Sequence, residues 1–101
     1  MGLSRNVSDD GKVLTIVLEE RFDFNAIHEF RDTYSEGVND VNNIIVDLAK
    51  TEYMDSSALG MLLNMQKSMQ AQVEKFSIVN ACPKVAKILK ISRFDKKFHI
   101  S

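Results

Sequence analysis

Hydrophobic residues change their spacing along the chain, and each change indicates a new element. Residues 3–7 alternate in character, residues 13–18 are β-branched and apolar, and Asp10-Gly11 between them favours a tight turn with positive φ. The chain is therefore expected to open with a β-hairpin. Residues 44–48 are almost continuously apolar, which is typical of a strand covered on both faces. This strand is expected in the middle of a sheet.

Apolar residues recur at helical spacing in three segments. The first covers residues 27–34, with Asp23 or Asn25 as a plausible N-cap and Gly37 as a C-terminal cap. The third begins at Pro83, a residue that suits the first position of a helix. Between them lies the longest of the three helices expected from this spacing.

That second helix is predicted over residues 56–71. Its buried stripe is expected to contain three leucines, Leu59, Leu62 and Leu63. Met61 and Met65, spaced i and i+4, would then flank this stripe and extend an apolar surface. Methionine is common both in cores and on adaptable binding surfaces, so core packing and partner contact are both open for this pair.

Short strands at residues 76–79 and 98–100 complete the pattern. The resulting order is β-β-α-β-α-β-α-β. Strands that alternate with helices must be joined by crossovers lying on a sheet face. The sequence therefore predicts an α/β protein with a mixed sheet and helices packed against it.

Composition restricts the class of function. The 101 residues carry 13 Lys and Arg against 14 Asp and Glu, a formal net charge of −1, which offers no concentrated basic surface for nucleic acid. The single cysteine, Cys82, cannot form an internal disulfide and suits a reducing cytosol. No run approaches the ~20 apolar residues that span a bilayer. We expect a cytoplasmic protein without membrane insertion, as a monomer or weak dimer.

Two adjacent serines carry the most informative chemistry. Ser56 and Ser57 follow a polar loop and open the second helix, where backbone N–H groups lack partners. One role is capping, in which Asp55 or Ser56 accepts a hydrogen bond worth about 1 kcal/mol. The other is phosphorylation, which adds about −1.5 to −2 charges where the helix dipole favours anions. One cap needs one side chain, so this group has a hydroxyl to spare.

This segment resembles the phosphorylation motif of STAS domains, specifically of bacterial anti-sigma factor antagonists. Residues 55–60 read Asp-Ser-Ser-Ala-Leu-Gly after an Ile/Val-Asp-Leu strand. The likeness extends to Phe22-Asp23-Phe24, to the strand ending in Val79-Asn80 and to residues 94–98. It covers nearly the whole chain, so residues 1–101 are expected to form a single STAS domain, a fold with about five strands.

The resemblance also implies what the serines do. Ser57 would be the phosphate acceptor, with Asp23, Asp55 and Ser56 lining the site. In that family the unphosphorylated protein sequesters an anti-sigma factor. A serine kinase, often the anti-sigma factor itself, phosphorylates it and ends binding, and a PP2C-type phosphatase resets it. The implied role is a partner-switching phosphoprotein in transcription regulation, which is not an enzyme. The alternative is a small STAS subunit of a lipid-transport ABC ATPase complex or a stress-signalling complex.

Ala58 departs from the family pattern, which usually has glycine after the second serine. Alanine adds a methyl group and favours helix over glycine by about 0.5 to 1 kcal/mol. This methyl group is expected to restrict close approach by a kinase somewhat, without abolishing the switch, because the acceptor hydroxyl itself remains.

Other chemistry fits these residues less well. Asp47 resembles the phosphate acceptor of a receiver domain, but the accompanying acidic pair after the first strand is missing, which favours a structural role. A serine hydrolase needs a base, and His28 and His99 have no local reason to converge on Ser57. One cysteine and two distant histidines lack metal-ligand spacing, and no glycine-rich phosphate loop is present. We expect no catalytic, metal or cofactor site, and ATP would belong to the kinase.

Overall fold

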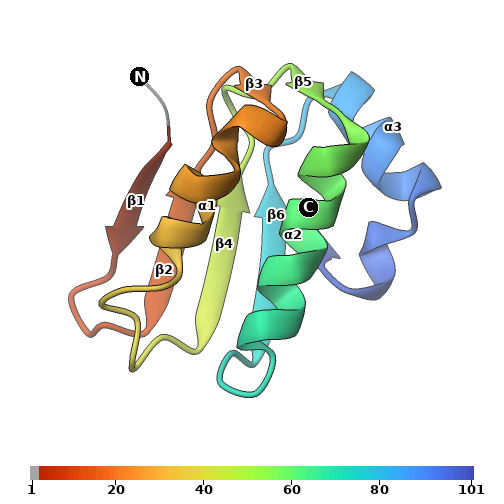
Figure 1. The fold of residues 1–101 in the computed structure, drawn as a ribbon. Helices are drawn as coiled ribbons and strands as arrows, with labels where there is room; N and C mark the ends of the chain where they lie inside the picture. The colour runs from red at the N-terminus through yellow and green to blue at the C-terminus, as the bar shows by residue number, and fades with distance from the viewer. Residues whose placement is uncertain (1–2) are drawn as a thin grey trace.

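The sheet determines the architecture. The computed structural model describes residues 3–101 and arranges five strands in the order β1-β2-β4-β6-β7 (Figure 1). β1 pairs with β2 in the antiparallel sense, and the other neighbours are parallel. The strands are β1 Ser4–Val7, β2 Val13–Val17, β4 Asn43–Asp47, β6 Lys75–Val79 and β7 His99–Ile100. The predicted mixed sheet and opening hairpin are confirmed, and Gly11 in the hairpin loop has a φ of 75°.

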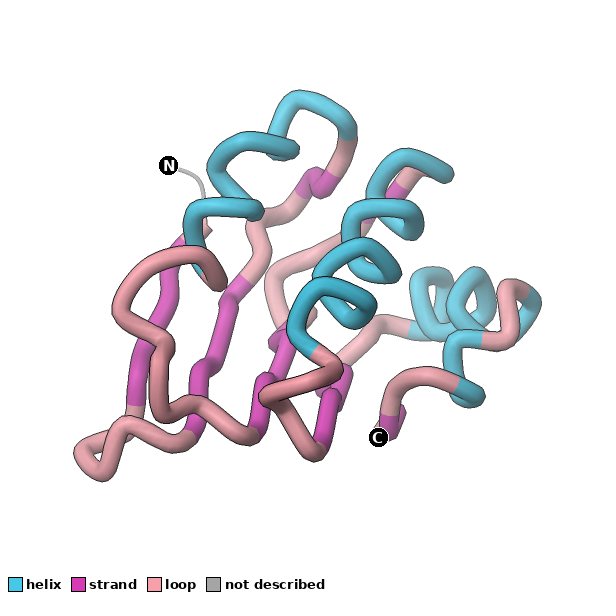
Figure 2. The backbone as a smooth tube through the Cα atoms, turned by 60° about the horizontal axis from the view of Figure 1, so that its bottom comes forward, coloured by secondary structure: helices cyan, strands magenta, loops and turns pink. Residues whose placement is uncertain are grey.

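Two helices cover one face of this sheet. In Figure 1, α1 passes in front of β2 and α2 passes in front of the β6 side. Both remain together on one side when the molecule is turned (Figure 2). The helices are α1 Ile27–Thr33, α2 Ser56–Met69 and α3 Pro83–Ile91, with short 3-10 turns η1 Phe24–Ala26 and η2 Phe94–Lys96. All three predicted α-helices are present.

The core lies between the sheet and these helices. On β4, Ile44 and Val46 are fully buried, whereas Ile45 and Asp47 on the opposite face are only half-buried. Side chains alternate between the two faces of a strand. β4 is in the centre of the sheet as predicted, but the expectation that it is covered on both faces is wrong, because α1 and α2 lie on the same side.

The first helix ends earlier than the sequence indicates. α1 stops at Thr33, and Gly37 lies beyond it in a turn with a φ of 68°. Arg5 of β1 takes over the cap: its Nη1 donates to the carbonyl oxygens of Thr33 at 2.8 Å and of Glu36 at 2.7 Å. One free carbonyl at the helix end and one in the turn that follows are thereby satisfied by a side chain that is distant in the sequence.

The buried stripe of α2 differs from the predicted one. Its buried residues are Ala58, Met61, Leu62, Met65 and Met69. Leu59 and Leu63 pack only partly against the core. Met61 and Met65 are 7% and 0% exposed. The hypothesis that they extend a partner-contact surface is therefore wrong for Met65, and only a small exposed part of Met61 is available for such contact. Both stripes have helical spacing, and the sequence pattern does not distinguish them.

Paired substitutions test this orientation of α2. Met65→Ala should lower the free energy of unfolding by about 2 to 5 kcal/mol, because it removes a fully buried side chain and leaves a cavity. Leu63→Ala should cost less than about half as much, because part of that side chain is already in water. Equilibrium urea unfolding measures both. A larger loss for Leu63→Ala than for Met65→Ala would mean that the helix faces the core differently.

Candidate functional site

The start of α2 holds the serine pair. Asp55 has extended backbone angles, and its Oδ1 accepts a hydrogen bond from the Ala58 N–H at 2.8 Å. Asp55 is therefore the N-cap, as one of the two capping alternatives predicted. Ser56 is exposed and Ser57 is half-buried. Neither serine hydroxyl makes a recorded hydrogen bond to residues 3–101, so both are free for other chemistry.

A second, two-stranded sheet holds this helix start in place. β3, Arg21–Phe22, pairs in parallel with β5, Tyr53–Met54. The loop is tied further by the Thr51 hydroxyl, which donates to the Glu19 carbonyl oxygen at 2.9 Å. Figure 1 shows β3 and β5 at the end of the main sheet, next to the starts of η1 and α2. The sequence does not predict this sheet, because two-residue strands have no recognisable periodicity.

Asp23 occupies the matching position before η1 and α1. Its Oδ1 accepts from the Asn25 N–H at 3.0 Å, which makes it the N-cap of η1. Its Oδ2 pairs with Arg21 Nε at 3.0 Å. The Arg21 guanidinium also lies 4.2 Å from the centre of the Tyr53 ring. Arg21 therefore connects the carboxylate of one loop to the aromatic ring of the other.

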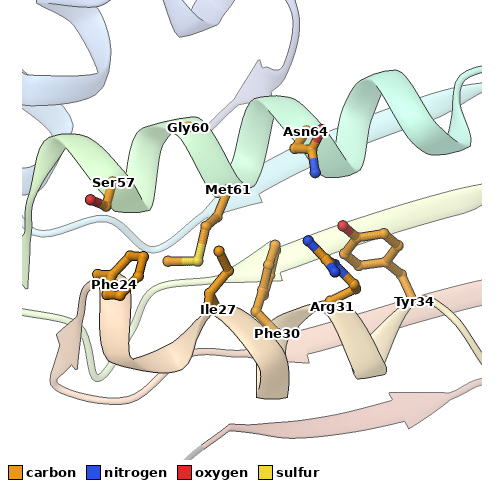
Figure 3. Close-up of a pocket in the computed structure, with 9 residues that line it drawn as sticks. All are labelled: Phe24, Ile27, Phe30, Arg31, Tyr34, Ser57, Gly60, Met61 and Asn64. Carbon is orange, nitrogen blue, oxygen red and sulfur yellow. The ribbon is translucent and has the colours of Figure 1, made fainter.

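A groove runs between α1 and α2, with Ser57 at one end (Figure 3). Its volume is about 330 Å³. Figure 3 shows Ser57 facing Phe24, Met61 beside Ile27, and Arg31, Tyr34 and Asn64 at the other end. The nine lining residues are Phe24, Ile27, Phe30, Arg31, Tyr34, Ser57, Gly60, Met61 and Asn64. Of these residues, only Ser57 and Met61 were predicted from the sequence as site or partner-contact residues.

Among the residues that line the groove, Phe24 is the one that the sequence could best have identified as a binding residue. Its side chain is 61% exposed, one of two large hydrophobic residues in the described chain with such exposure. It stands between Asp23 and Asn25, two capping-type residues. Its exposed ring forms one wall of the groove at the Ser57 end.

The charges around the groove are unevenly distributed. Asp55 precedes Ser57 by two residues and Asp23 precedes Phe24, so carboxylates adjoin the Ser57 end. Arg31 is the one charged residue among those that line the groove. Burial raises the pKa of the Tyr34 hydroxyl, and the adjacent positive charge of Arg31 opposes this shift. Arg31 therefore makes one end of the groove basic, whereas the carboxylates of Asp23 and Asp55 lie outside its lining and accept capping hydrogen bonds.

Ala58 does not lie on the surface beside Ser57. It is 0% exposed, and it belongs to the core stripe of α2. The additional methyl group therefore points into the protein, and the expectation that it restricts a kinase is wrong. Its contribution to the site is the backbone N–H that Asp55 caps.

Asp47 has the structural role that the sequence favoured. Its Oδ1 accepts from the Ala49 N–H at 2.9 Å and from Asn80 Nδ2 at 3.1 Å. Asn80 itself has a φ of 62°, a conformation that asparagine tolerates better than most residues. The side chain thus joins the ends of β4 and β6.

Catalytic constellations are not found around Ser57 in residues 3–101. Neither histidine lines the groove, and His28 and His99 are both exposed. The described residues also contain no group of three or more His, Cys, Asp or Glu side chains placed to hold a metal ion. No helix in this part of the chain has both the length and the apolar character to cross a bilayer.

The fold is that of an α/β protein with a mixed five-stranded sheet, and its site is a capped helix start beside a surface groove. Comparison with known sequences gives the family. The sequence profile of the STAS domain matches residues 4–101. The chain therefore belongs to the STAS domain family. A STAS-domain containing protein of Pseudomonas aeruginosa is 42% identical over 101 residues, covering 100% of both chains.

Solved structures with this fold include one protein in two states. The anti-sigma factor antagonist SpoIIAA in its unphosphorylated form is 21% identical with a TM-score of 0.72, over 89% of this chain and 83% of that chain. The phosphorylated form of SpoIIAA, a Bacillus cell fate determinant, is 20% identical with a TM-score of 0.74, over 99% and 91%. At these identities the likeness establishes the fold, as the sequence resemblance implied.

Substitution of the cap tests the geometry of the helix start. Asp55→Ala should lower the free energy of unfolding by about 1 kcal/mol, because the Ala58 N–H loses its side-chain acceptor. Asp55→Asn should stay within a few tenths of a kcal/mol of the parent, since asparagine caps as well as aspartate. Equal losses in both variants, measured by urea unfolding, would show that the charge of Asp55 matters and its cap does not.

Proposed function

We propose that this protein is an anti-sigma factor antagonist whose binding is switched by phosphorylation of Ser57. The unphosphorylated chain sequesters an anti-sigma factor, and the phosphorylated chain releases it. One observation carries the proposal: Ser57 opens onto the groove with a free hydroxyl, because Asp55 already caps the helix. Membership of the STAS family and the shared fold with SpoIIAA, a protein known in both phosphorylation states, support it.

The surroundings of Ser57 suit a switch that acts through charge. A phosphate brings about −1.5 to −2 charges to this position. The helix N-terminus accommodates an anion, so the group need not unfold α2. Arg31 lies at the far end of the groove and Arg21 is engaged with Asp23, so the phosphate charge remains directed at the partner. A partner that fits the neutral hydroxyl then meets two added charges beside Asp55 and Asp23.

The enzymes of the cycle are separate proteins in this proposal. The chain contributes the acceptor, a serine kinase contributes ATP, and the kinase and the anti-sigma factor can be one polypeptide. A PP2C-type phosphatase restores the hydroxyl. The protein itself is a non-enzymatic component of transcription regulation that works in the cytoplasm.

Phosphate mapping tests the acceptor. After incubation with the cognate serine kinase and ATP, peptide mass spectrometry should place the phosphate on Ser57. Ser57→Ala should abolish labelling and Ser56→Ala should retain it, because only Ser57 lines the groove. Loss of label in Ser56→Ala with full labelling of Ser57→Ala would move the acceptor to the neighbouring serine.

Affinity for the anti-sigma factor tests the release mechanism. Ser57→Asp should weaken binding by about tenfold or more, since a carboxylate supplies part of the phosphate charge. Ser56→Asp is the matched control, because it adds the same charge one residue away on an exposed position. Isothermal titration calorimetry gives both affinities. Equal effects at the two positions would contradict a site centred on Ser57. A pull-down from native cells tests the alternative, because capture of a transporter ATPase instead of an anti-sigma factor would favour membership of another assembly.

A further inference from the structure

The groove between α1 and α2 has the chemistry of a receptor for one kind of protein segment. We propose that it binds an amphipathic helix of the partner, which places an apolar side chain against Phe24 and Met61 and an Asp or Glu against Arg31. The inference deepens the proposed function, because it gives the partner's recognition element. It does not depend on phosphorylation.

The apolar half of the groove is incompletely covered by the chain itself. Phe24 is 61% exposed, Ile27 is half-buried, and Met61 contributes the edge of its buried side chain. Together they line the groove at its Ser57 end, with Phe24 and Ile27 from the α1 side and Met61 reaching toward them from α2 (Figure 3). Such exposed aromatic surface in a groove is a frequent anchor point for a partner side chain.

The Arg31 end of the groove determines which charge the partner segment carries. Arg31 is exposed, and the described residues contain one ion pair, that between Arg21 and Asp23. Arg31 is thus a cation with no recorded carboxylate partner, fixed beside Tyr34 and facing the groove (Figure 3). A guanidinium binds carboxylates with two parallel hydrogen bonds, so an acidic side chain complements this end.

The length of the groove determines how far apart the apolar and acidic residues of the partner segment lie. On α2 it extends from Ser57 to Asn64, a separation of seven residues and roughly 10 Å of helix. A partner helix aligned with it presents same-face side chains four and seven residues apart over that distance. The expected segment therefore has an apolar residue followed or preceded, at a separation of four or seven, by Asp or Glu.

Gly60 supports close approach of the partner. It lies in the middle of the groove-forming part of α2, is exposed, and a Cβ added there would meet nothing within 4 Å. No contact within the described chain requires glycine at this position, although glycine weakens a helix relative to alanine. We interpret its small size as space for the incoming segment.

Photo-crosslinking identifies the occupant. p-Benzoylphenylalanine is placed at position 24 of the full chain in the cells that produce it, and at position 91, the other highly exposed hydrophobic residue, as control. Mass spectrometry should map the position-24 crosslink to a helical segment with the apolar and acidic pair. A crosslink to a second copy of this chain, to a segment without the acidic residue, or no yield above position 91 overturns the inference.

Charge reversal then tests the pairing with the mapped partner. Arg31→Glu should weaken binding about tenfold or more, and reversal of the mapped acidic residue to lysine should restore it. Lys87→Glu on α3, outside the groove, should leave affinity within about twofold. Gly60→Ala should raise the melting temperature while it lowers affinity, a combination that loss of folding cannot produce. Unchanged affinity in Arg31→Glu or in Gly60→Ala would refute the proposed docking mode.

The identity of the crosslinked protein separates this inference from the proposed function. An anti-sigma factor that carries the expected segment supports both. The same segment in another class of protein supports the docking mode and overturns the anti-sigma role. An anti-sigma factor that binds but is insensitive to Arg31→Glu supports the role and overturns the docking mode.

Discussion

Parallel pairing of β2 with β4 decides where the groove between α1 and α2 forms. Parallel strands end at the same edge of a sheet, so the segments that follow Val17 and Asp47 leave it side by side. They pair once more as β3 and β5 before each turns into a helix. α1 and α2 consequently begin together and cover the same face, and the groove between them follows from this arrangement.

Capping chemistry then fixes the details of that surface. Asp23 and Asp55 each accept a backbone N–H at the start of a helical segment, and Arg21 ties the first of these carboxylates to Tyr53. The acidic character near Ser57 is therefore a consequence of how the two helices start.

Most of the fold was predictable from the sequence, because long elements have clear periodicity. The three helices, the central strand and the opening hairpin follow from apolar spacing and from Pro83 and Asp10-Gly11. The rotation of α2 was not predictable, since Leu59 and Met65 both fall on stripes with helical spacing. The Asp55 cap was among the predicted alternatives, but Arg5 at the end of α1 was not, because its partners lie 28 and 31 residues away.

The candidate site was predicted only at its Ser57 end. Motif residues can be recognised in a sequence by their type and order, whereas Phe24, Arg31 and Asn64 line the same groove only after α1 packs beside α2. Local pattern also misjudged Ala58, whose position next to Ser57 in sequence suggested a surface role. Its side chain points into the core instead, because adjacent helical residues are separated by roughly 100° around the axis.

The Asp55 cap has a consequence for the lifetime of the protein in the cell. Because an aspartate holds the start of α2, chemical change at either serine hydroxyl leaves the cap bond in place. Degradation of a folded protein depends on how often it opens, and hence on the free energy of unfolding. Under the proposed switch, both charge states of the chain should then have similar turnover, and the same molecules could pass through repeated cycles.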